Sequence, residues 1–438
     1  MGFSIHRVDH TENEAYYLEG MKCFSETDPG FPPGSLYSSK SQPIQGFQWA
    51  DYSAKPHHDY TYTITALKGR PSNLVPFLTT SITISTEETD ALKHNVYFNR
   101  GTAASQEYIR RFGNKSPEKV SNPNAAFEWL SRGLYKAMTK FVNDCIGNNH
   151  SLRIAAYEFN YEPFLQVLKN AIEKGVDIQI VYDARKNNPK IGNENAIRKI
   201  GLEKYCYPRA EGKSYISHNK FMIKIDENGD PLSVWTGGTN FSDGGIFGHS
   251  NVSHVIENAE IAQLFLRYWN ALKNDLPVAK IKKETEKISS IPTSPPPVGT
   301  STLFSPRESL DALNYYADLA MNSKQGLFMT FAFGLNKVFK DVYRNSNAPF
   351  RLALLEKITR PYEKTEEAAK LADEKEIQEL RNLPENIFAI GEFIRTNELD
   401  GWVKERLTGL NKNVNYIHNK FMLIDPLSDD PIVIAGSA

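Results

Sequence analysis

The chain has 438 residues, of which 40% are hydrophobic and 24% are charged, a globular composition that excludes a disordered or low-complexity protein. Its 51 basic and 52 acidic side chains leave a net charge of −1, so the total charge demands no anionic polymer as partner. The length predicts two or three domains, each with its own core.

Alternating apolar residues near the N-terminus predict β-strands. One such run holds Tyr60, Tyr62 and Ile64, and another follows the turn-forming sequence Lys-Gly-Arg-Pro at residues 68–71. We therefore expect a β-rich N-terminal domain over residues 1–121, built on a small antiparallel sheet or sandwich.

Over residues 126–145 the apolar spacing changes to three or four residues, which predicts one amphipathic helix. A strand, a helix and a strand are then predicted over residues 152–157, 164–174 and 176–182. Gly175 suits the end of that helix, so the three elements form a βαβ unit. We place this first α/β unit in residues 122–277.

The same order of elements returns near the C-terminus, with a strand, a helix and a strand predicted over residues 327–332, 338–343 and 350–355. We place the second α/β unit in residues 303–438. Residues 278–302 are expected to be a linker, because the serine- and proline-rich part after Ile288 sustains neither helix nor sheet. Residues 364–381 are rich in Glu, Lys and Ala, which predicts a solvated helix within the second unit.

An internal repeat carries the sharpest signal. The five residues His-Asn-Lys-Phe-Met at 218–222 return at 418–422, in equivalent places of the two βαβ units. Five consecutive identities indicate a duplication rather than an accident. In an extended strand, side chains two apart face the same way, so His218 lies beside Lys220 and His418 beside Lys420. Such a pair suits an anionic tetrahedral group, since imidazole attacks or transfers a proton while ammonium offsets charge on the oxygens.

Two other interpretations of the repeat remain. A single copy would most simply be a polar strand face, and only the duplication favours a functional site. A metal site is the second alternative, because histidine is a common ligand. The lysine beside each imidazole repels cations, and no Cys, Asp or Glu completes a zinc set at the usual spacing. We therefore expect neither a metal nor another cofactor.

The second copy matches a known signature. His418, Lys420 and, after four further residues, Asp425 fit the H-x-K-x4-D motif of the phospholipase D superfamily, which the chain resembles from about residue 126 to its end. In the first copy five residues separate Lys220 from Asp226, which predicts a one-residue bulge or a shifted turn. The resemblance implies an α/β fold with two pseudo-symmetric phospholipase D-like α/β/α units behind the N-terminal β-rich domain.

The resemblance also implies the chemistry. In this family one histidine attacks phosphorus to give a phosphohistidine, and the other protonates the leaving oxygen. By similarity we assign His218 as the nucleophile and His418 as the general acid. Lys220 and Lys420 are expected to stabilise the charged transition state together with Asn240, since the Gly-Gly-Thr-Asn sequence ending there resembles the family's phosphate-holding G-G/S-x-N segment.

Three further carboxylates are assigned by the same resemblance. The family uses a carboxylate downstream of this asparagine to orient a histidine ring, and Glu257 occupies the comparable stretch. The alternative interpretation of Glu257 is a solvent-facing glutamate ahead of a helix. Asp226 and Asp425 are expected to be structural. The chain reaches Ala438 where the family places a second asparagine, so we expect a fragment of a longer protein that is weakly active or inactive.

The expected partner is a phosphodiester, with a phospholipid-type substrate hydrolysed or transferred. A nuclease of the same superfamily and a non-catalytic phosphate-binding module are the alternatives. The near-zero net charge disfavours tight binding of nucleic acid, although Arg110, Arg111, Lys115 and Lys119 are candidates for a basic patch. The sequence shows no basic amphipathic helix or lipidation motif, and this argues against a lipid substrate.

The expected location is the cytoplasm. Met1–Glu19 contains no apolar run of the kind a secretory signal needs, and no run of the sequence is long enough to span a bilayer. The cysteines are odd in number and widely spaced, at Cys23, Cys145 and Cys206, which argues against a disulfide framework and favours a reducing compartment.

Overall fold

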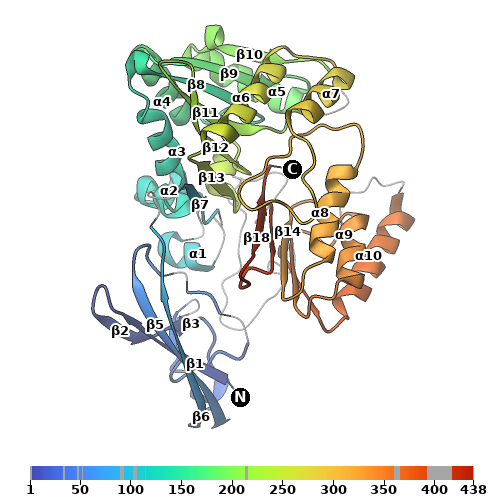
Figure 1. Cartoon of the computed structure of the whole chain (residues 1–438). Helices are drawn as coiled ribbons and strands as arrows, with labels where there is room; N and C mark the ends of the chain where they lie inside the picture. Colours follow the sequence, from blue (N-terminus) through green and yellow to red (C-terminus); the bar gives the residue numbers. More distant parts are fainter. Residues whose placement is uncertain are drawn as a thin grey trace. The chain divides into compact units, whose positions relative to one another are not determined.

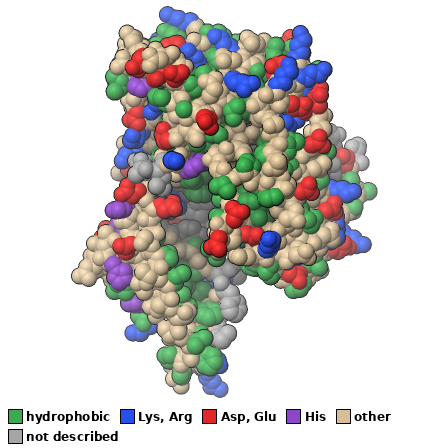
Figure 2. Space-filling view, in the orientation of Figure 1, with side chains coloured by type: hydrophobic (Ala, Val, Ile, Leu, Met, Phe, Trp, Pro, Cys, Tyr) green, Lys and Arg blue, Asp and Glu red, His purple; other side chains and the backbone are tan. Residues whose placement is uncertain are grey.

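The structure is a computed structural model, and it describes residues 2–32, 35–46, 49–51, 53–88, 93–101, 106–113, 115–212, 216–359, 366–391 and 417–437. They fall into two compact units (Figure 1). The first contains Met1–Leu92 and Ala104–Lys115, and the second contains Lys93–Ala103, Ser116–Thr396 and Leu407–Ala438. Basic and acidic side chains are interspersed on the face drawn in Figure 2. Among the helices in these ranges, none combines the length and apolar composition that crossing a bilayer requires.

The first unit is built on a four-stranded antiparallel sheet, which confirms the predicted N-terminal strands. Its order is β2 (Glu14–Tyr17), β1 (Gly2–Asp9), β5 (Asp59–Arg70) and β6 (Asn73–Ser85). The long hairpin β5–β6 turns at the predicted place, and Gly69 adopts a φ of 108°, which a side chain would disfavour. The remaining elements are β3 (Glu19–Gly20), β4 (Tyr37–Ser38), a 3-10 turn (Ser25–Thr27) and α1 (Gln106–Phe112).

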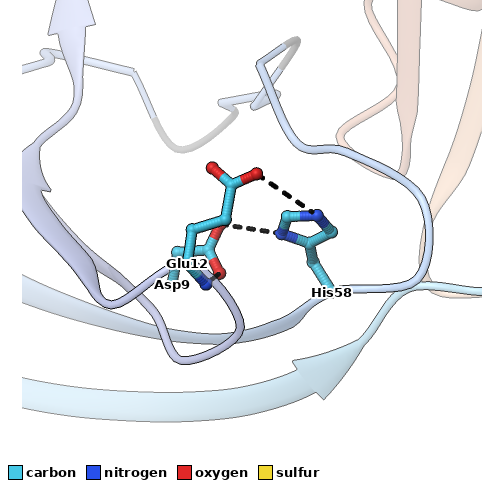
Figure 3. Close-up of side chains that lie close together, drawn as sticks. All are labelled: Asp9, Glu12 and His58. Carbon is cyan, nitrogen blue, oxygen red and sulfur yellow. Dashed lines mark hydrogen bonds and ion pairs between the residues drawn. The ribbon is translucent and has the colours of Figure 1, made fainter.

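An ion cluster joins the end of β1 to the residue before β5 (Figure 3). His58 Nδ1 lies 2.9 Å from the carboxylate of Asp9, which is buried. His58 Nε2 lies 3.8 Å from the carboxylate of Glu12. The backbone N–H groups of Thr11 and Glu12 donate to the other Asp9 oxygen at 3.0 Å. These bonds occupy both oxygens of the buried carboxylate, so the cluster stabilises the turn that follows β1.

The second unit contains a seven-stranded sheet in which the predicted βαβ unit is confirmed. The sheet order is β10 (Cys206–Arg209), β9 (Asp177–Asp183), β8 (His150–Ala156), β11 (Lys220–Asp226), β12 (Pro231–Gly237), β13 (Val252–Ile256) and β7 (His94–Phe98). The strands β10, β9 and β8 are parallel, and the pairs from β8 onward are antiparallel. Helix α4 (Glu162–Glu173) connects β8 to β9, and Gly175 follows it with a φ of 98°. The irregular register between Lys224 and Ile225 agrees with the bulge expected in the first motif.

The prediction of a single helix over residues 126–145 is wrong. Two helices occupy that range, α2 (Pro123–Ser131) and α3 (Leu134–Asn143). Arg132 and Gly133 between them have φ values of 47° and 87°, and a left-handed residue ends an α-helix. The apolar spacing continues across the break, which is why periodicity alone joined the two helices.

Two expected domain boundaries also differ from the structure. Strand β7 lies inside the range 1–121 but pairs with β13, so it belongs to the second unit. The expected linker 278–302 begins with a helix, α7 (Val278–Ile288), whose buried Ile281 packs with α6 (Ala259–Lys273). Both differences arise because burial against a distant element, not local composition, decides where these segments fold.

A five-stranded sheet forms the rest of the second unit. Its order is β16 (Asn386–Ile390), β15 (Arg351–Leu355), β14 (Leu327–Phe331), β17 (Phe421–Ile424) and β18 (Ile432–Ala435). This order, three parallel strands followed by two antiparallel ones, equals that of β10, β9, β8, β11 and β12. Three helices lie beside the sheet in Figure 1: α8 (Asp311–Met321), α9 (Lys337–Asn345) and α10 (Glu367–Arg381). The α/β class is confirmed, and a pseudo-symmetric relation between the two halves stays a prediction.

The core of the larger sheet decides which way the first motif faces. Helix α6 packs Phe265 and Trp269 against Phe221, and Trp269 Nε1 donates a hydrogen bond of 2.8 Å to Ile154 O. Because neighbouring side chains on a strand alternate, burying Phe221 under α6 turns Lys220 to the opposite side of the sheet. The remaining segments are α5 (Asn187–Ile200), a π-helical turn (Gly244–Gly248) and 3-10 turns at Pro117–Lys119, Gly147–Asn149 and Glu203–Tyr205.

Candidate active site

The two His-Asn-Lys segments lie against each other within the second unit. His218 Nδ1 is 2.7 Å from the carbonyl oxygen of Ser437, which follows β18. In return, the backbone N–H of His418 donates to Ser250 O at 3.1 Å, next to a parallel bridge between Ser250 and Ile417. Each motif is therefore held by the other half of the second unit, His218 by Ser437 and His418 by Ser250.

Each histidine and its lysine lie beside the same aromatic ring, although His218 precedes β11 and both His418 and Lys420 precede β17. In the first copy, Tyr157 meets both: its ring centroid is 4.8 Å from that of His218 and 5.1 Å from Lys220 Nζ. In the second copy, Phe333 is 6.0 Å from the His418 ring and 5.7 Å from Lys420 Nζ.

Each lysine ammonium folds back on its own motif. Lys220 Nζ donates to His218 O at 3.1 Å, and Lys420 Nζ donates to His418 O at 2.9 Å. An ammonium carries three N–H bonds, and in the described ranges of the chain one of the three is accepted in each case. The two buried ammonium groups therefore keep donors for an anion.

Two buried carboxylates, which the sequence analysis missed, hold the segments in place. The backbone N–H of Ser217 donates to Asp183 at the end of β9, and that of Ile417 donates to Glu356 directly after β15, at 2.9 Å. Both acceptors are almost completely buried, at 0% and 1% exposure. The sequence did contain a signal for these residues, since an acidic residue ends the second strand in each predicted βαβ unit. The ends of neighbouring strands lie at the same edge of the sheet, and this brings the carboxylate to the motif.

We expect Asp183→Asn to lower the free energy of unfolding by about 3–5 kcal/mol, because it breaks a buried ion pair and weakens the acceptor of the Ser217 N–H. Arg185 pairs with Asp183, and both side chains are 0% exposed. Urea unfolding measures the effect. The matched control is Asp177→Asn, whose partner is Arg153 and whose side chain is 58% exposed. That variant is expected to lose less than about 1 kcal/mol. Equal losses in the two variants would contradict the role given to Asp183.

Asn240 lies in the turn after β12. The turn passes close to the second motif, because a Cβ on Gly238 would lie 3.1 Å from Asn251 Oδ1 and 3.6 Å from His418 O. Asn240 is 4% exposed, and within the described part of the chain its Oδ1 has no hydrogen-bond partner. A buried amide end without a partner costs free energy, which is consistent with a group kept for a ligand.

The structure does not bring Glu257 to the histidines. Glu257 is exposed, directly after β13, and its backbone N–H donates to Lys93 O. The side chain that meets His418 is Asn251, directly before β13, whose Oδ1 lies 2.8 Å from His418 Nδ1. The five residues of β13 separate the two positions, so the strand carries Glu257 away from the site that Asn251 enters.

Asp226 and Asp425 lie at the far ends of the motif strands. Asp226 Oδ1 accepts the N–H of Asn228 and of Asp230, closing the turn between β11 and β12. Asp425 accepts the backbone N–H groups of Lys324, Gln325 and Gly326 just before β14. Burial opposes ionisation of Asp425, but these donors outweigh it and lower the pKa of its carboxyl. Both contacts hold turns together and are made at the opposite end of the strand from the histidines.

Burial and concentrated positive charge lower the pKa of every basic group at the site. Burial and the two lysines lower the pKa of His218 to about 2, and burial with Lys420 and His249 holds the pKa of His418 far below its usual value. Burial lowers the pKa of Lys420 to about 7 and, with the charge of Lys420, lowers that of Lys220 strongly. An anion between the lysines would reverse these effects and raise all four pKa values.

A group of candidate metal ligands lies outside the two motifs. Among the described residues, the group that offers three ligand atoms within 4.8 Å of one another is Asp9, Glu12 and His58, in the first unit (Figure 3). It shares no residue with the two motifs.

The chain was compared with known structures. Three similar ones are a polyphosphate kinase from Porphyromonas gingivalis, a phosphatidylserine synthase from Haemophilus influenzae Rd KW20, and Nuc, a phospholipase D family member from Salmonella typhimurium. Their sequence identities are 11%, 11% and 22%, and their TM-scores are 0.41, 0.43 and 0.29. The matches cover 71%, 67% and 42% of this chain, and 44%, 74% and 94% of the other. This chain thus spans less than half of the polyphosphate kinase.

Sequence comparison matches part of the chain to a known family. None of the curated proteins compared with the chain matches it. Residues 142–273, which include the first motif and Asn240, match the family described as cardiolipin synthase, PLD-like domain. The match confirms the resemblance to the phospholipase D superfamily over residues 142–273, which form a phospholipase D-like domain.

Proposed function

We propose that this chain is a metal-independent phosphodiesterase that works through a phosphohistidine. Members of the superfamily are phosphodiesterases, nucleases or synthases. The observation that carries the proposal is that His218 contacts Ser437 while the backbone of His418 contacts Ser250, which brings the charges of Lys220 and Lys420 near both histidines and lowers the pKa of each ring. Two imidazoles and two ammonium groups around one space suit one phosphodiester anion.

The hydrogen bonds leave His218 able to act as the nucleophile, and its assignment over His418 rests on the resemblance. Ser437 O can only accept, so His218 Nδ1 carries the hydrogen and the lone pair of the neutral ring is on Nε2. In the proposed reaction Nε2 attacks phosphorus, the bond from phosphorus to the leaving oxygen breaks, and His418 donates a proton to that oxygen. His418 then takes a proton from water or an alcohol, whose oxygen attacks phosphorus and breaks the phosphorus–nitrogen bond.

The general acid must be protonated when the substrate is bound. Burial and the nearby lysines hold the pKa of His418 low, which favours the neutral ring. A phosphodiester anion between Lys220 and Lys420 offsets their charge and raises the pKa of His418. Substrate binding and protonation of the acid are therefore coupled in the proposed mechanism.

We propose a phospholipid-type phosphodiester as the substrate. Ile216, two residues before His218, is 38% exposed, and Phe333, beside the ring of His418, is 48% exposed. Apolar side chains next to the anion site suit a substrate with an apolar part. Of the candidate basic patch, Arg110 and Arg111 both pair with Glu107, and Figure 2 shows charges of both signs interspersed. These observations favour a lipid over a nucleic acid.

The function is tested by incubating the purified chain with EDTA and four substrates: phospholipid vesicles, single-stranded DNA, duplex DNA and bis(p-nitrophenyl) phosphate. Turnover of the aryl diester and of the lipid is expected to survive chelation. Turnover of DNA with a steep dependence on salt would identify a nuclease instead. Binding of phosphate without turnover of any substrate would identify a phosphate-binding module.

Anion binding gives a prediction that needs no turnover. Sulfate keeps its charge across neutral pH, and it needs Lys420 protonated. Because the pKa of Lys420 is lowered to about 7, the free site loses this charge above that pH. We expect affinity to fall by up to about tenfold per pH unit above 7, with one proton taken up on binding. Calorimetry in buffers of different ionisation enthalpy measures both. Lys420→Gln should bind more weakly and with a flatter pH dependence, and a variant as steep as wild type would contradict this.

A further inference from the structure

A third histidine, which the proposed mechanism does not use, lies against His418. His249 follows the π-helical turn Gly244–Gly248 and is 8% exposed. Its ring centroid is 4.4 Å from that of His418, with 32° between the ring planes. An imidazole in this position either packs against the site or takes part in holding it.

The amide of Asn251 connects the two rings. Asn251 Nδ2 donates to Gly245 O at 2.8 Å and lies 2.9 Å from His249 Nδ1, while Oδ1 lies 2.8 Å from His418 Nδ1. A carbonyl oxygen only accepts, so Gly245 identifies the nitrogen end of the amide and leaves the oxygen end for His418. Each of the three contacts of the Asn251 amide then pairs one donor with one acceptor.

These contacts specify where the protons are. Asn251 Oδ1 can only accept, so His418 carries its hydrogen on Nδ1 and leaves the lone pair of the neutral ring on Nε2. Asn251 Nδ2 can only donate, so His249 accepts through Nδ1 and carries its own hydrogen on Nε2. The two neighbouring rings therefore hold opposite tautomers.

The backbone around His249 is tied to the end of strand β7. Asn99 Nδ2 donates to Ile246 O at 2.7 Å and to His249 O at 3.0 Å, and Asn99 Oδ1 accepts the N–H of Asn251 at 2.7 Å. Gly101, with a φ of 57°, approaches the backbone of His249 so closely that a Cβ would collide with it. The position of His249 is thus set independently of His418.

We propose that His249 is a positioning residue, which accepts the second amide N–H of Asn251 and thereby keeps Asn251 turned so that His418 presents a free Nε2 to the site. Without this acceptor, the amide keeps only the bond to Gly245 at its nitrogen end, and rotation of the amide becomes less costly. Rotation would place N–H groups against His418 Nδ1 and favour the other tautomer. The catalytic consequence rests on the function proposed above, whereas the tautomers do not.

A protonated His249 could not accept from Asn251, so the arrangement requires a neutral ring. Burial and the charge of Lys420 lower the pKa of His249 to about 3. Lys220 acts in the same direction. The same lysines that suit the site to an anion therefore support the acceptor role of His249.

Two variants of nearly equal shape separate this role from packing. His249→Asn keeps an acceptor, because the oxygen of asparagine can lie where Nδ1 does, and His249→Leu removes it. The first readout is the 15N chemical shift of the His418 ring nitrogens in the chain labelled with 15N-histidine. The second is turnover of bis(p-nitrophenyl) phosphate.

Wild type and His249→Asn are expected to show the hydrogen of His418 on Nδ1, while His249→Leu shows a mixture of tautomers. His218 is an internal control, because Ser437 O holds its tautomer in every variant. For kcat we expect a loss on the order of tenfold in His249→Leu, with KM unchanged, and recovery of most of it in His249→Asn.

Each outcome decides the inference. An unchanged His418 tautomer in His249→Leu, or equal effects of Asn and Leu, would leave His249 as packing only. Should His249→Leu not fold, the wild-type spectrum still tests the proposal, since a hydrogen on Nε2 of His418 or on Nδ1 of His249 would overturn it. A chain without any turnover would remove the proposed function while the tautomer result stands by itself.

Discussion

Replacing His218 with alanine is expected to lower turnover of bis(p-nitrophenyl) phosphate on the order of 10,000-fold, because no other group forms the bond to phosphorus. The bond from His218 Nδ1 to Ser437 O leaves the lone pair of the neutral ring on Nε2. The measurement is the steady-state release of p-nitrophenolate. In wild type, alkaline quenching during turnover should also recover a phosphoramidate that is stable to base and labile to acid.

The matched control for this variant is His94→Ala. His94 is exposed in strand β7 and lies beside His254, outside both motifs. It should keep wild-type turnover, which excludes a general effect of removing a histidine. A His218→Ala chain that keeps more than about a tenth of the wild-type rate would show that His218 is not the nucleophile.

Replacing His418 with alanine is expected to have an effect that depends on the leaving group. A p-nitrophenolate leaves without a proton, so the first step should persist and release one p-nitrophenolate per chain in a burst. The second step needs a base to activate water, so the phosphohistidine should accumulate. For a diester with an alkyl leaving group, the loss should reach about 1,000-fold or more, because the first step also needs the acid.

The burst distinguishes the two histidines. Quenched-flow measurement of its amplitude, with 31P detection of the accumulated adduct, assigns the nucleophile directly. A burst in His218→Ala and none in His418→Ala would reverse the assignment, which rests on resemblance. No burst in either variant would contradict a covalent intermediate.

Local signals in the sequence predicted a large part of the fold. The predicted strands around Gly175 appear as β8 and β9, and those of the second half as β14 and β15, because alternation and runs of apolar residues are properties of the segment itself. The repeated pair of histidine and lysine could be found for the same reason. A strand presents alternate side chains to one side wherever it packs.

Other features could not be found in this way. Asn251 and Glu257 lie at opposite ends of β13, and resemblance alone favoured the carboxylate. Only the pairing of β13 with β12 shows which end of the strand reaches His418. Nothing in the sequence shows which groups Asp183 and Glu356 contact. Only the tertiary structure shows that they accept the backbone N–H groups of Ser217 and Ile417.

The sequence by itself determined that this protein carries two copies of a histidine and lysine pair on strands of an α/β fold, because duplication and periodicity are written in consecutive residues. The tertiary structure alone decided that the copies meet, that His249 and Asn251 join His418, and that Glu257 does not. Contacts between residues far apart in sequence depend on which strands pair and which faces become buried. Those choices minimise the free energy of the whole fold and leave little trace in any single segment.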